Sequence, residues 1–362
     1  MKIYVAATRQ NDGKTIVSLG LISAILKRTS KVGYIKPVGQ HYIEVDGNKI
    51  DEDAILVKDT FGLECDLQDM SPVAVPRGFT ESYINNPHRD ELARAISGAY
   101  ERVSDGADFT LIEGTGHAGV GSVFDMSNAD VAHLLGSKVI LVSAGGVGKP
   151  IDEVMLNKAL FDALDVEILG VIVNKIQAEK YEKIEPIVRK GLERKGLEVL
   201  GVLPHNPVLS NPTIEELMED IGGEILGGEG GIGNTVTRMV IGAMPPHEAL
   251  DFLGKGVLFI TPGTREDLIL AAMSTCIIGQ CSNSTVAGII LTGGKRPHEK
   301  IMNLFDHTCV PIISVPEDTF TAATKINKLI VKIRPGDMNK IQATERLVSE
   351  YVNVDRILEK LR

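Results

Sequence analysis

The stretch VAATRQNDGKTIVSLGLISAIL, from Val5 to Leu26, decides the fold class. It opens as an apolar run typical of a buried strand, passes through a polar loop ending in Gly13-Lys14-Thr15, and continues with the pattern of an amphipathic helix. In this arrangement backbone N–H groups and a lysine bind a phosphate chain, while a hydroxyl binds magnesium. The sequence therefore predicts a phosphate-binding P-loop near the amino end.

The loop departs at one position from the pattern G-x-x-x-x-G-K-[ST]. Thr8 stands five residues before Gly13, where that pattern has its first glycine. The alternative is a surface turn that happens to contain Gly-Lys-Thr. A strand directly before the loop and a helix directly after it favour the phosphate site, because that setting points backbone N–H groups at the ligand.

Short apolar, β-branched runs alternate with helical patterns through the first half of the chain. The helical patterns include residues 153–164 and 183–196, where apolar side chains recur every three or four positions. This alternation is typical of a doubly wound, mainly parallel α/β sheet. The strand-like runs cover residues 2–7, 31–37, 109–114, 137–143, 166–176 and 197–204.

The alternation stops at residues 222–233, which hold seven glycines, and then restarts. We interpret the glycine-rich stretch as a linker or mobile loop and predict a second, smaller α/β domain after it. We divide the chain into residues 1–216 and 217–362. The helical tail at 337–361 is assigned to the second domain, although the sequence does not decide which domain it packs against.

Composition excludes several classes of protein. The 362 residues carry 48 acidic and 38 basic side chains, a net charge of −10, so a nucleic-acid backbone would be repelled. The apolar run at the amino end is too short for a signal peptide or a membrane span, so we expect a cytoplasmic protein with no membrane partner. The cysteines Cys65, Cys276, Cys281 and Cys309 lack a C-x-x-C pair and are expected to be reduced thiols.

Four polar side chains follow predicted strands or begin a helix, where an α/β fold places its ligands. Lys36 and Glu113 each end a strand-like run, and Glu113 could hold magnesium. Asp53 lies at a probable helix start, where a capping role is as plausible as metal binding. Asn174 could contact a base edge or form a turn.

The motifs ATRQNDGKT, YIKPV, DEDA, IEGTG and VIVNKI together resemble the dethiobiotin synthetase-like P-loop proteins, over residues 1–216. The resemblance explains the threonine at the first glycine position. It implies that Gly13, Lys14 and Thr15 bind the triphosphate of ATP. Thr8 and Asp12, in the same loop, join this nucleotide-binding set.

The same resemblance implies that Asp53 and Glu113, with Thr15, hold Mg²⁺. Lys36 would meet the transferred phosphate or an acidic small-molecule ligand, so Lys14 and Lys36 are the candidate catalytic lysines. Asn174 would contact adenine. The sequence NKIQ has Gln177 where guanine readers have aspartate, which favours ATP over GTP.

Residues 256–294 resemble a DRTGG domain, and the domain order resembles the N-terminal region of long phosphotransacetylases. The turn Thr292-Gly293-Gly294 could contact a ligand or simply reverse the chain. The chain stops near where a phosphotransacetylase catalytic domain would start, so acetyl transfer is not expected. The loop at 113–128 departs from the synthetase pattern, and His117 within it is a possible substrate contact or an uncommitted surface residue.

Three functions follow from these patterns. The first is an ATP-binding regulatory or sensor protein with slow ATP hydrolysis, and a homodimer is expected from base rates and analogy. The second is a Mg-ATP-dependent ligase that activates a carboxylate or carbamate, as in dethiobiotin or cobyrinate amide synthesis. The third is a scaffold with a decayed loop. We favour the regulatory protein, because fusion to a DRTGG-like domain suits a sensor and no feature fixes a ligase substrate.

Overall fold

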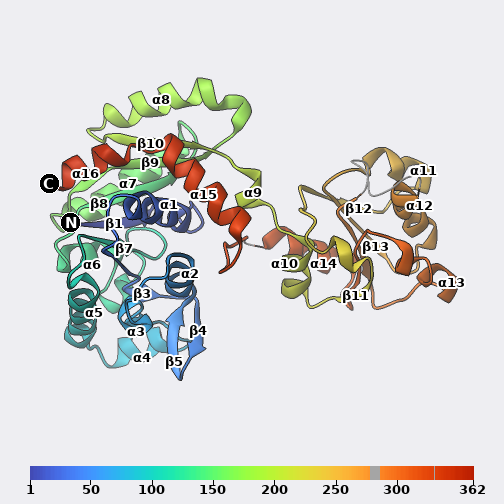
Figure 1. Cartoon of the computed structure of the whole chain (residues 1–362), viewed down its shortest axis with the longest axis horizontal. Coiled ribbons are helices and arrows are strands. Elements are labelled where there is room, and N and C mark those ends of the chain that lie inside the picture. The colour runs from blue at the N-terminus through green and yellow to red at the C-terminus, as the bar shows by residue number, and fades with distance from the viewer. Residues whose placement is uncertain (278–285, 330) are drawn as a thin grey trace. The chain divides into compact units, whose positions relative to one another are not determined.

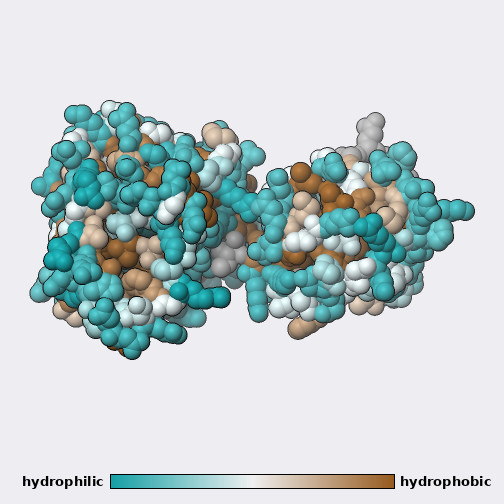
Figure 2. Space-filling view, turned by 90° about the horizontal axis from the view of Figure 1, so that it is seen from below, coloured by the Kyte–Doolittle hydropathy of each residue, from teal (hydrophilic) through white to brown (hydrophobic). Residues whose placement is uncertain are grey.

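The computed structural model describes residues 1–277, 286–329 and 331–362 and divides the chain into two compact units. Unit 1 comprises Met1–Asn206 together with Ile333–Arg362, and unit 2 comprises Pro207–Lys332 (Figure 1). Most of the surface drawn in Figure 2 is hydrophilic, with hydrophobic residues in smaller patches. Within the described ranges, no helix combines the length and apolar character needed to cross a membrane.

The central sheet of unit 1 has six parallel strands in the order β10-β9-β8-β1-β7-β2. Their residues are mostly buried and rich in valine and isoleucine, as is typical of strands covered on both faces. The predicted doubly wound α/β fold is confirmed, and β1 lies in the middle of the sheet. The strands are β1 Lys2–Ala7, β2 Val32–Ile35, β7 Phe109–Glu113, β8 Val139–Ala144, β9 Ile168–Ile176 and β10 Val199–Pro204.

Helices connect these strands and cover the sheet (Figure 1). Helix α1 packs on β1 and β7, α5 packs on β2 and β7, and α7 packs on β8. Two short strand pairs lie between β2 and α5: β3 Val38–Gly39 with β6 Val73–Ala74, and β4 Tyr42–Val45 with β5 Asn48–Asp51. The helices are α1 Lys14–Leu26, α2 Glu52–Phe61, α3 Leu67–Met70, α4 Phe79–Asn85, α5 Arg89–Ser104, α6 Asn128–Leu134, α7 Lys149–Ala163 and α8 Tyr181–Glu193.

The C-terminal helices, α15 Met338–Tyr351 and α16 Val354–Leu361, belong to unit 1. This differs from the assignment of the tail to the second domain. The apolar face of α15 packs against α1, where Gly20 leaves room for Val348. The Ser23 hydroxyl donates to Glu345 at 2.8 Å, and Val352 bridges to Gly201 of β10. Burial of the tail on unit 1 is the physical reason for the difference.

Unit 2 is the second α/β fold, with a mixed sheet in the order β11-β15-β14-β13-β12. Four strands are parallel, and β11 pairs antiparallel with β15. Two separate hydrophobic clusters form its core, one around Ile290 and Ile313, the other around Phe259 and Phe305. The elements are α9 Pro207–Ser210, α10 Ile214–Ile221, β11 Glu224–Gly227, β12 Arg238–Ile241, α11 Pro246–Ala249, β13 Val257–Pro262, α12 Glu266–Ile277, β14 Gly288–Thr292, α13 Glu299–Met302, β15 Ile312–Ser314 and α14 Thr319–Lys328.

The glycine-rich stretch at 222–233 contains strand β11 of the unit 2 sheet, so the interpretation as a linker is wrong. Gly222 ends α10 in the left-handed conformation, and β11 follows at once. A Cβ on Gly228 would lie 2.0 Å from the Val310 carbonyl oxygen. The glycines therefore allow close backbone approach at the sheet edge. Along the chain, the boundaries between the two units lie at residues 206/207 and 332/333 instead.

The cysteines only partly match the expectation of reduced thiols. Cys65 is a free, half-buried thiol. Cys309 is disulfide-bonded, which differs from the expectation. The side chains of Cys276 and Cys281 lie outside the described part of the chain.

Candidate functional site

The loop between β1 and α1 ends in a backbone conformation that favours glycine. Gly13 has φ +102°, in the left-handed region, and a Cβ there would lie 2.1 Å from the Asn174 side-chain nitrogen. Helix α1 begins at Lys14 without a side-chain cap. Its first N–H groups and the positive end of the helix dipole therefore lie beside the loop, where an anion would bind.

The loop is held in place by one of its own side chains and by two side chains from β9. The Thr8 hydroxyl donates to Asp12 at 2.6 Å, so the threonine that replaces the expected glycine closes the loop. The Asn174 amide donates to the Asp12 carbonyl oxygen at 3.0 Å, and the Lys175 ammonium donates to the Asn11 carbonyl oxygen at 2.7 Å. These bonds fix the loop conformation before any ligand arrives.

Lys14 is a buried ammonium that has no counter-ion in direct contact within the described part of the chain. The residue is 8% exposed, and its ammonium makes no hydrogen bond or ion pair with the residues that the structure describes. Burial and the nearby Lys36 charge lower the pKa of Lys14 to about 8. A buried charge is costly unless it is paired, so this position favours an anionic ligand.

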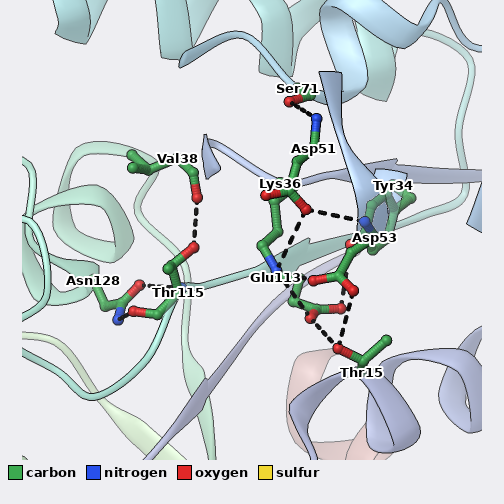
Figure 3. A network of polar contacts seen from close by, with 10 residues as sticks. All are labelled: Thr15, Tyr34, Lys36, Val38, Asp51, Asp53, Ser71, Glu113, Thr115 and Asn128. Atoms are coloured by element: carbon green, nitrogen blue, oxygen red, sulfur yellow. Dashed lines mark hydrogen bonds and ion pairs between the residues drawn. The ribbon is translucent and has the colours of Figure 1, made fainter. Parts of the chain in front are cut away.

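Thr15, Asp53, Glu113 and Lys36 converge beside the loop (Figure 3). The Thr15 hydroxyl oxygen lies 3.0 Å from Glu113 Oε1 and 3.3 Å from Asp53 Oδ1. The Lys36 ammonium contacts Asp53 Oδ2 and lies 3.3 Å from Glu113 Oε1. Each carboxylate thus contacts both the Thr15 hydroxyl on α1 and the Lys36 ammonium, which follows β2.

Two further residues complete this cluster and were not predicted from the sequence. The Asp51 side chain caps α2 and lies 3.9 Å from the Lys36 ammonium, and burial raises the pKa of Asp51 to about 6. The Tyr34 hydroxyl donates to Glu113 Oε2 at 3.2 Å, and burial raises the pKa of Tyr34 well above its usual value. The only signal for Asp51 was its place in KIDEDAIL, two residues before Asp53.

The oxygen atoms around Thr15 suit a magnesium ion, which prefers carboxylate and hydroxyl oxygens. The single Thr15 proton can serve only one of its two carboxylate neighbours, so a cation there would satisfy both. Across the described residues, however, no group of three or more His, Cys, Asp or Glu side chains is arranged to hold a metal by itself. A metal ion would therefore need Thr15, phosphate oxygens or water as further ligands.

The loop after β7 is fixed by Asn128 rather than left open. Asn128 Oδ1 accepts from the Tyr4 hydroxyl at 2.8 Å and the Thr115 N–H at 2.9 Å, and its amide nitrogen donates to the Thr115 and His117 carbonyl oxygens. The Thr115 hydroxyl donates to Val38, as Figure 3 shows. The His117 side chain is exposed. This loop thus forms a rigid wall beside Glu113.

The structure brings most of the predicted site residues together at the carboxyl edge of the sheet. Lys14, Thr15, Lys36, Asp53 and Glu113 lie around the amino end of α1. Thr8, Asp12 and Gly13 form the loop itself. Asn174 lies against the loop, with its side chain already bonded to the Asp12 carbonyl and the Lys175 N–H. Its predicted contact with adenine stays a prediction.

Comparisons with known sequences match the two units to two families. The AAA domain model matches residues 1–213, and the DRTGG domain model matches residues 216–329. The phosphate acetyltransferase of Nitratidesulfovibrio vulgaris is 28% identical over 370 residues, which cover 99% of this chain and 51% of that protein. The Synechocystis sp. phosphate acetyltransferase is 26% identical and is covered to 52%. The chain thus spans about half the length of these curated relatives.

The solved structures that match parts of the chain are more distant. The MinC:MinD cell division complex of Aquifex aeolicus is 18% identical with a TM-score of 0.38, covering 57% of this chain and 83% of that chain. The CBS and DRTGG domains of Clostridium perfringens pyrophosphatase, complexed with diadenosine tetraphosphate, are 20% identical with a TM-score of 0.28, covering 40% and 61%. The predicted resemblance to a DRTGG domain and to phosphotransacetylases is confirmed by the sequence matches. The narrower resemblance to dethiobiotin synthetase stays a prediction.

Proposed function

The chain belongs to the AAA domain family, and from this premise we propose that it is an ATP-binding regulatory protein whose unit 1 binds MgATP. One observation carries the proposal. The buried Lys14 ammonium, without an ion-pair partner among described residues, lies at the uncapped amino end of α1. A polyphosphate would supply the negative charge that this ammonium lacks and would accept hydrogen bonds from the first turn of the helix.

The remaining residues have defined places in this proposal. Thr8, Asp12 and Gly13 would shape the loop around the phosphates. Thr15, Asp53 and Glu113 would hold Mg²⁺, which neutralises phosphate charge when it is bound. Gln177 follows Asn174 and Lys175, and its amide lacks the carboxylate that accepts the N–H donors of guanine, which favours adenine.

The chain connectivity supports regulation as the role of nucleotide binding. Unit 2 is inserted between β10 and α15, both of which belong to unit 1. Helix α15 packs directly on α1, the helix that begins at Lys14. A change at the phosphate loop therefore has a short covalent and packing route to the segment that leaves unit 2. We propose that unit 2 carries the response to nucleotide, with slow ATP hydrolysis in unit 1.

MgATP binding is expected to take up protons at about pH 8.5 and to weaken as the pH rises through about 8. Binding raises the pKa of Lys14 above its value of about 8 in the free protein, because phosphate pairs with the charged form. The lysine is already protonated at about pH 7, so uptake is small there. Affinity is thus highest below the free pKa and falls as pH rises through it. Isothermal titration calorimetry in buffers of different ionisation enthalpy measures the protons taken up.

The same titration tests the proposed function itself. Parallel injections of MgATP, MgGTP and inorganic tripolyphosphate separate phosphate binding from base recognition. Heat from MgATP, with weaker binding of MgGTP, is the expected result. Absence of binding for all three ligands at millimolar concentration would refute the proposal, and binding without proton uptake would refute the role of Lys14.

Replacing Asn174 by Ala is expected to lower the affinities for ATP and for inorganic tripolyphosphate by a similar factor, roughly 5- to 50-fold. The loss comes from removing one or two hydrogen bonds that hold the loop. The reason is that the Asn174 amide holds the Asp12 carbonyl and therefore shapes the phosphate loop. A residue that only read adenine would affect ATP and leave tripolyphosphate, which has no base, unchanged. Calorimetric titration with both ligands distinguishes the two roles.

Lys180→Ala is a suitable control, since Lys180 is an exposed residue of the same β9–α8 connection. It should leave both affinities unchanged. Loss of ATP binding with intact tripolyphosphate binding in Asn174→Ala would show that Asn174 reads the base, as the family resemblance implies.

A further inference from the structure

The Lys36 ammonium contacts both of the carboxylates that a metal ion on Thr15, Asp53 and Glu113 would use. Its ammonium contacts Asp53 Oδ2 and Glu113 Oε1, and Glu113 Oε1 is the same atom that lies 3.0 Å from the Thr15 hydroxyl. Figure 3 shows the ammonium pointing between the two carboxylates toward Thr15. Magnesium holds its oxygen ligands at about 2.0–2.1 Å, so an ion on Glu113 Oε1 would lie close to this ammonium, and the two positive charges would repel each other.

The lysine is fixed in this place by its own surroundings. It is 5% exposed, and its backbone N–H donates to the Met70 carbonyl oxygen at 2.7 Å. Pro37 follows it and restricts its backbone to an extended conformation. The backbone at the end of β2 is therefore fixed, and the ammonium at the end of the flexible side chain balances part of the charge of Asp51, Asp53 and Glu113.

The second lysine of the site has a different role. Lys14 makes no direct ion pair with these carboxylates among described residues, although it lies within range of their charge. The site therefore holds one ammonium committed to the metal-binding carboxylates and one left for phosphate. Only the first has to move before a cation can reach Thr15, Asp53 and Glu113.

We propose that Lys36 is an internal counter-ion that keeps divalent cations off Thr15, Asp53 and Glu113 until a polyphosphate binds. This inference rests on the proposed function. An arriving polyphosphate offers the Lys36 ammonium new oxygen partners and at the same time adds ligands for the metal. The ammonium then turns from the carboxylates to the phosphate, and the cation takes its place. Metal and nucleotide would thus bind together, and neither carboxylate would be left unpaired.

The test measures Mn²⁺ binding without nucleotide, using electron paramagnetic resonance to count free Mn²⁺. Lys36→Met keeps the apolar stem and removes the ammonium, and it is expected to bind Mn²⁺ at least about tenfold more tightly than the natural protein. Lys27→Met is the matched control, because it removes the same charge from an exposed position just after α1. It should bind Mn²⁺ like the natural protein. Lys36→Met with Asp53→Asn should lose the gain.

A second measurement tests the inference even if Lys36→Met is less stable because its carboxylates lack a counter-ion. Its thermal unfolding midpoint should rise with MgCl₂ alone, whereas the midpoint of the natural protein should not. The natural protein also gives a decisive result by itself: its Mn²⁺ affinity should rise when a non-hydrolysable ATP analogue is added, beyond the affinity of the analogue for Mn²⁺ in solution.

Tight Mn²⁺ binding to the natural protein without nucleotide would overturn the inference, as would an unchanged affinity in folded Lys36→Met. Calorimetry with MgATP on the natural protein separates this from failure of the proposed function. If MgATP binds and Lys36→Met gains no metal affinity, only the counter-ion role fails. If MgATP does not bind at all, the proposed function fails, whatever the Mn²⁺ result.

Discussion

Replacing Lys14 by Met lowers the affinity for MgATP by at least about 100-fold, the expected result of removing one partner of a buried charge pair worth about 3–5 kcal/mol. In the free protein the Lys14 ammonium is buried and has no ion pair with a described residue. In the complex it would contact phosphate oxygens with little water to screen the charge. Calorimetric titration with MgATP measures the loss.

The stability of the free protein is expected to change in the opposite sense. Burial lowers the pKa of Lys14, which means that the charged form is disfavoured in the folded state. Methionine has a similar shape and no charge, so Lys14→Met should unfold at the same urea concentration as the natural protein or a higher one. Lys27→Met, with the same charge change on the surface, should affect neither property. Retained MgATP affinity in Lys14→Met would show that Lys14 does not bind phosphate and would contradict the argument for the proposed function.

Replacing Val348 by Asp is expected to destabilise unit 1 by at least about 3 kcal/mol, because it removes a buried apolar group and buries a charge. Val348 is fully buried on α15 and lies against Gly20 of α1. The Val348 side chain lies directly against the backbone of Gly20, so an aspartate there would have no space for hydrating water. Urea unfolding followed by circular dichroism measures the change in free energy.

Ser349→Asp is the matched control, since Ser349 is the next residue on the same helix and is exposed. It should change the free energy of unfolding by less than about 0.5 kcal/mol. If Val348→Asp left the unfolding of unit 1 unchanged while destabilising unit 2, the tail would belong with unit 2, as the sequence-based division placed it. Unchanged unfolding of both units would contradict the packing of α15 on α1.

The six strands of the main sheet and the phosphate loop could be predicted from the sequence for a clear physical reason. Strands buried on both faces need continuous apolar, β-branched runs, and these stand out against helical spacing. Parallel strands also place their carboxyl ends at one edge, so Lys36 and Glu113, each at the end of such a run, could be expected near Lys14. Local pattern and topology agree here.

Other parts of the structure depend on contacts between distant segments. The amphipathic pattern of 337–361 predicts that the tail packs on something, but only the three-dimensional arrangement shows α1 and β10 as its partners. Many glycines at 222–233 are typical both of a flexible linker and of a sheet edge where backbones pack closely, so the sequence does not separate the two. The sequence around Asn174 does not show whether its side chain contacts a base or holds the Asp12 carbonyl. Asp51 joins the site only because Lys36, from a distant strand, lies beside it.

The insertion of unit 2 within unit 1 has a consequence for biosynthesis. The ribosome delivers α1 early, but the helix that covers its Gly20 face comes only after residues 207–332 have been made. Between the end of α1 at Leu26 and α15 at Met338–Tyr351, synthesis at roughly 5–20 residues per second takes tens of seconds. During that time the nascent chain exposes the apolar face of α1 that Val348 of α15 later covers.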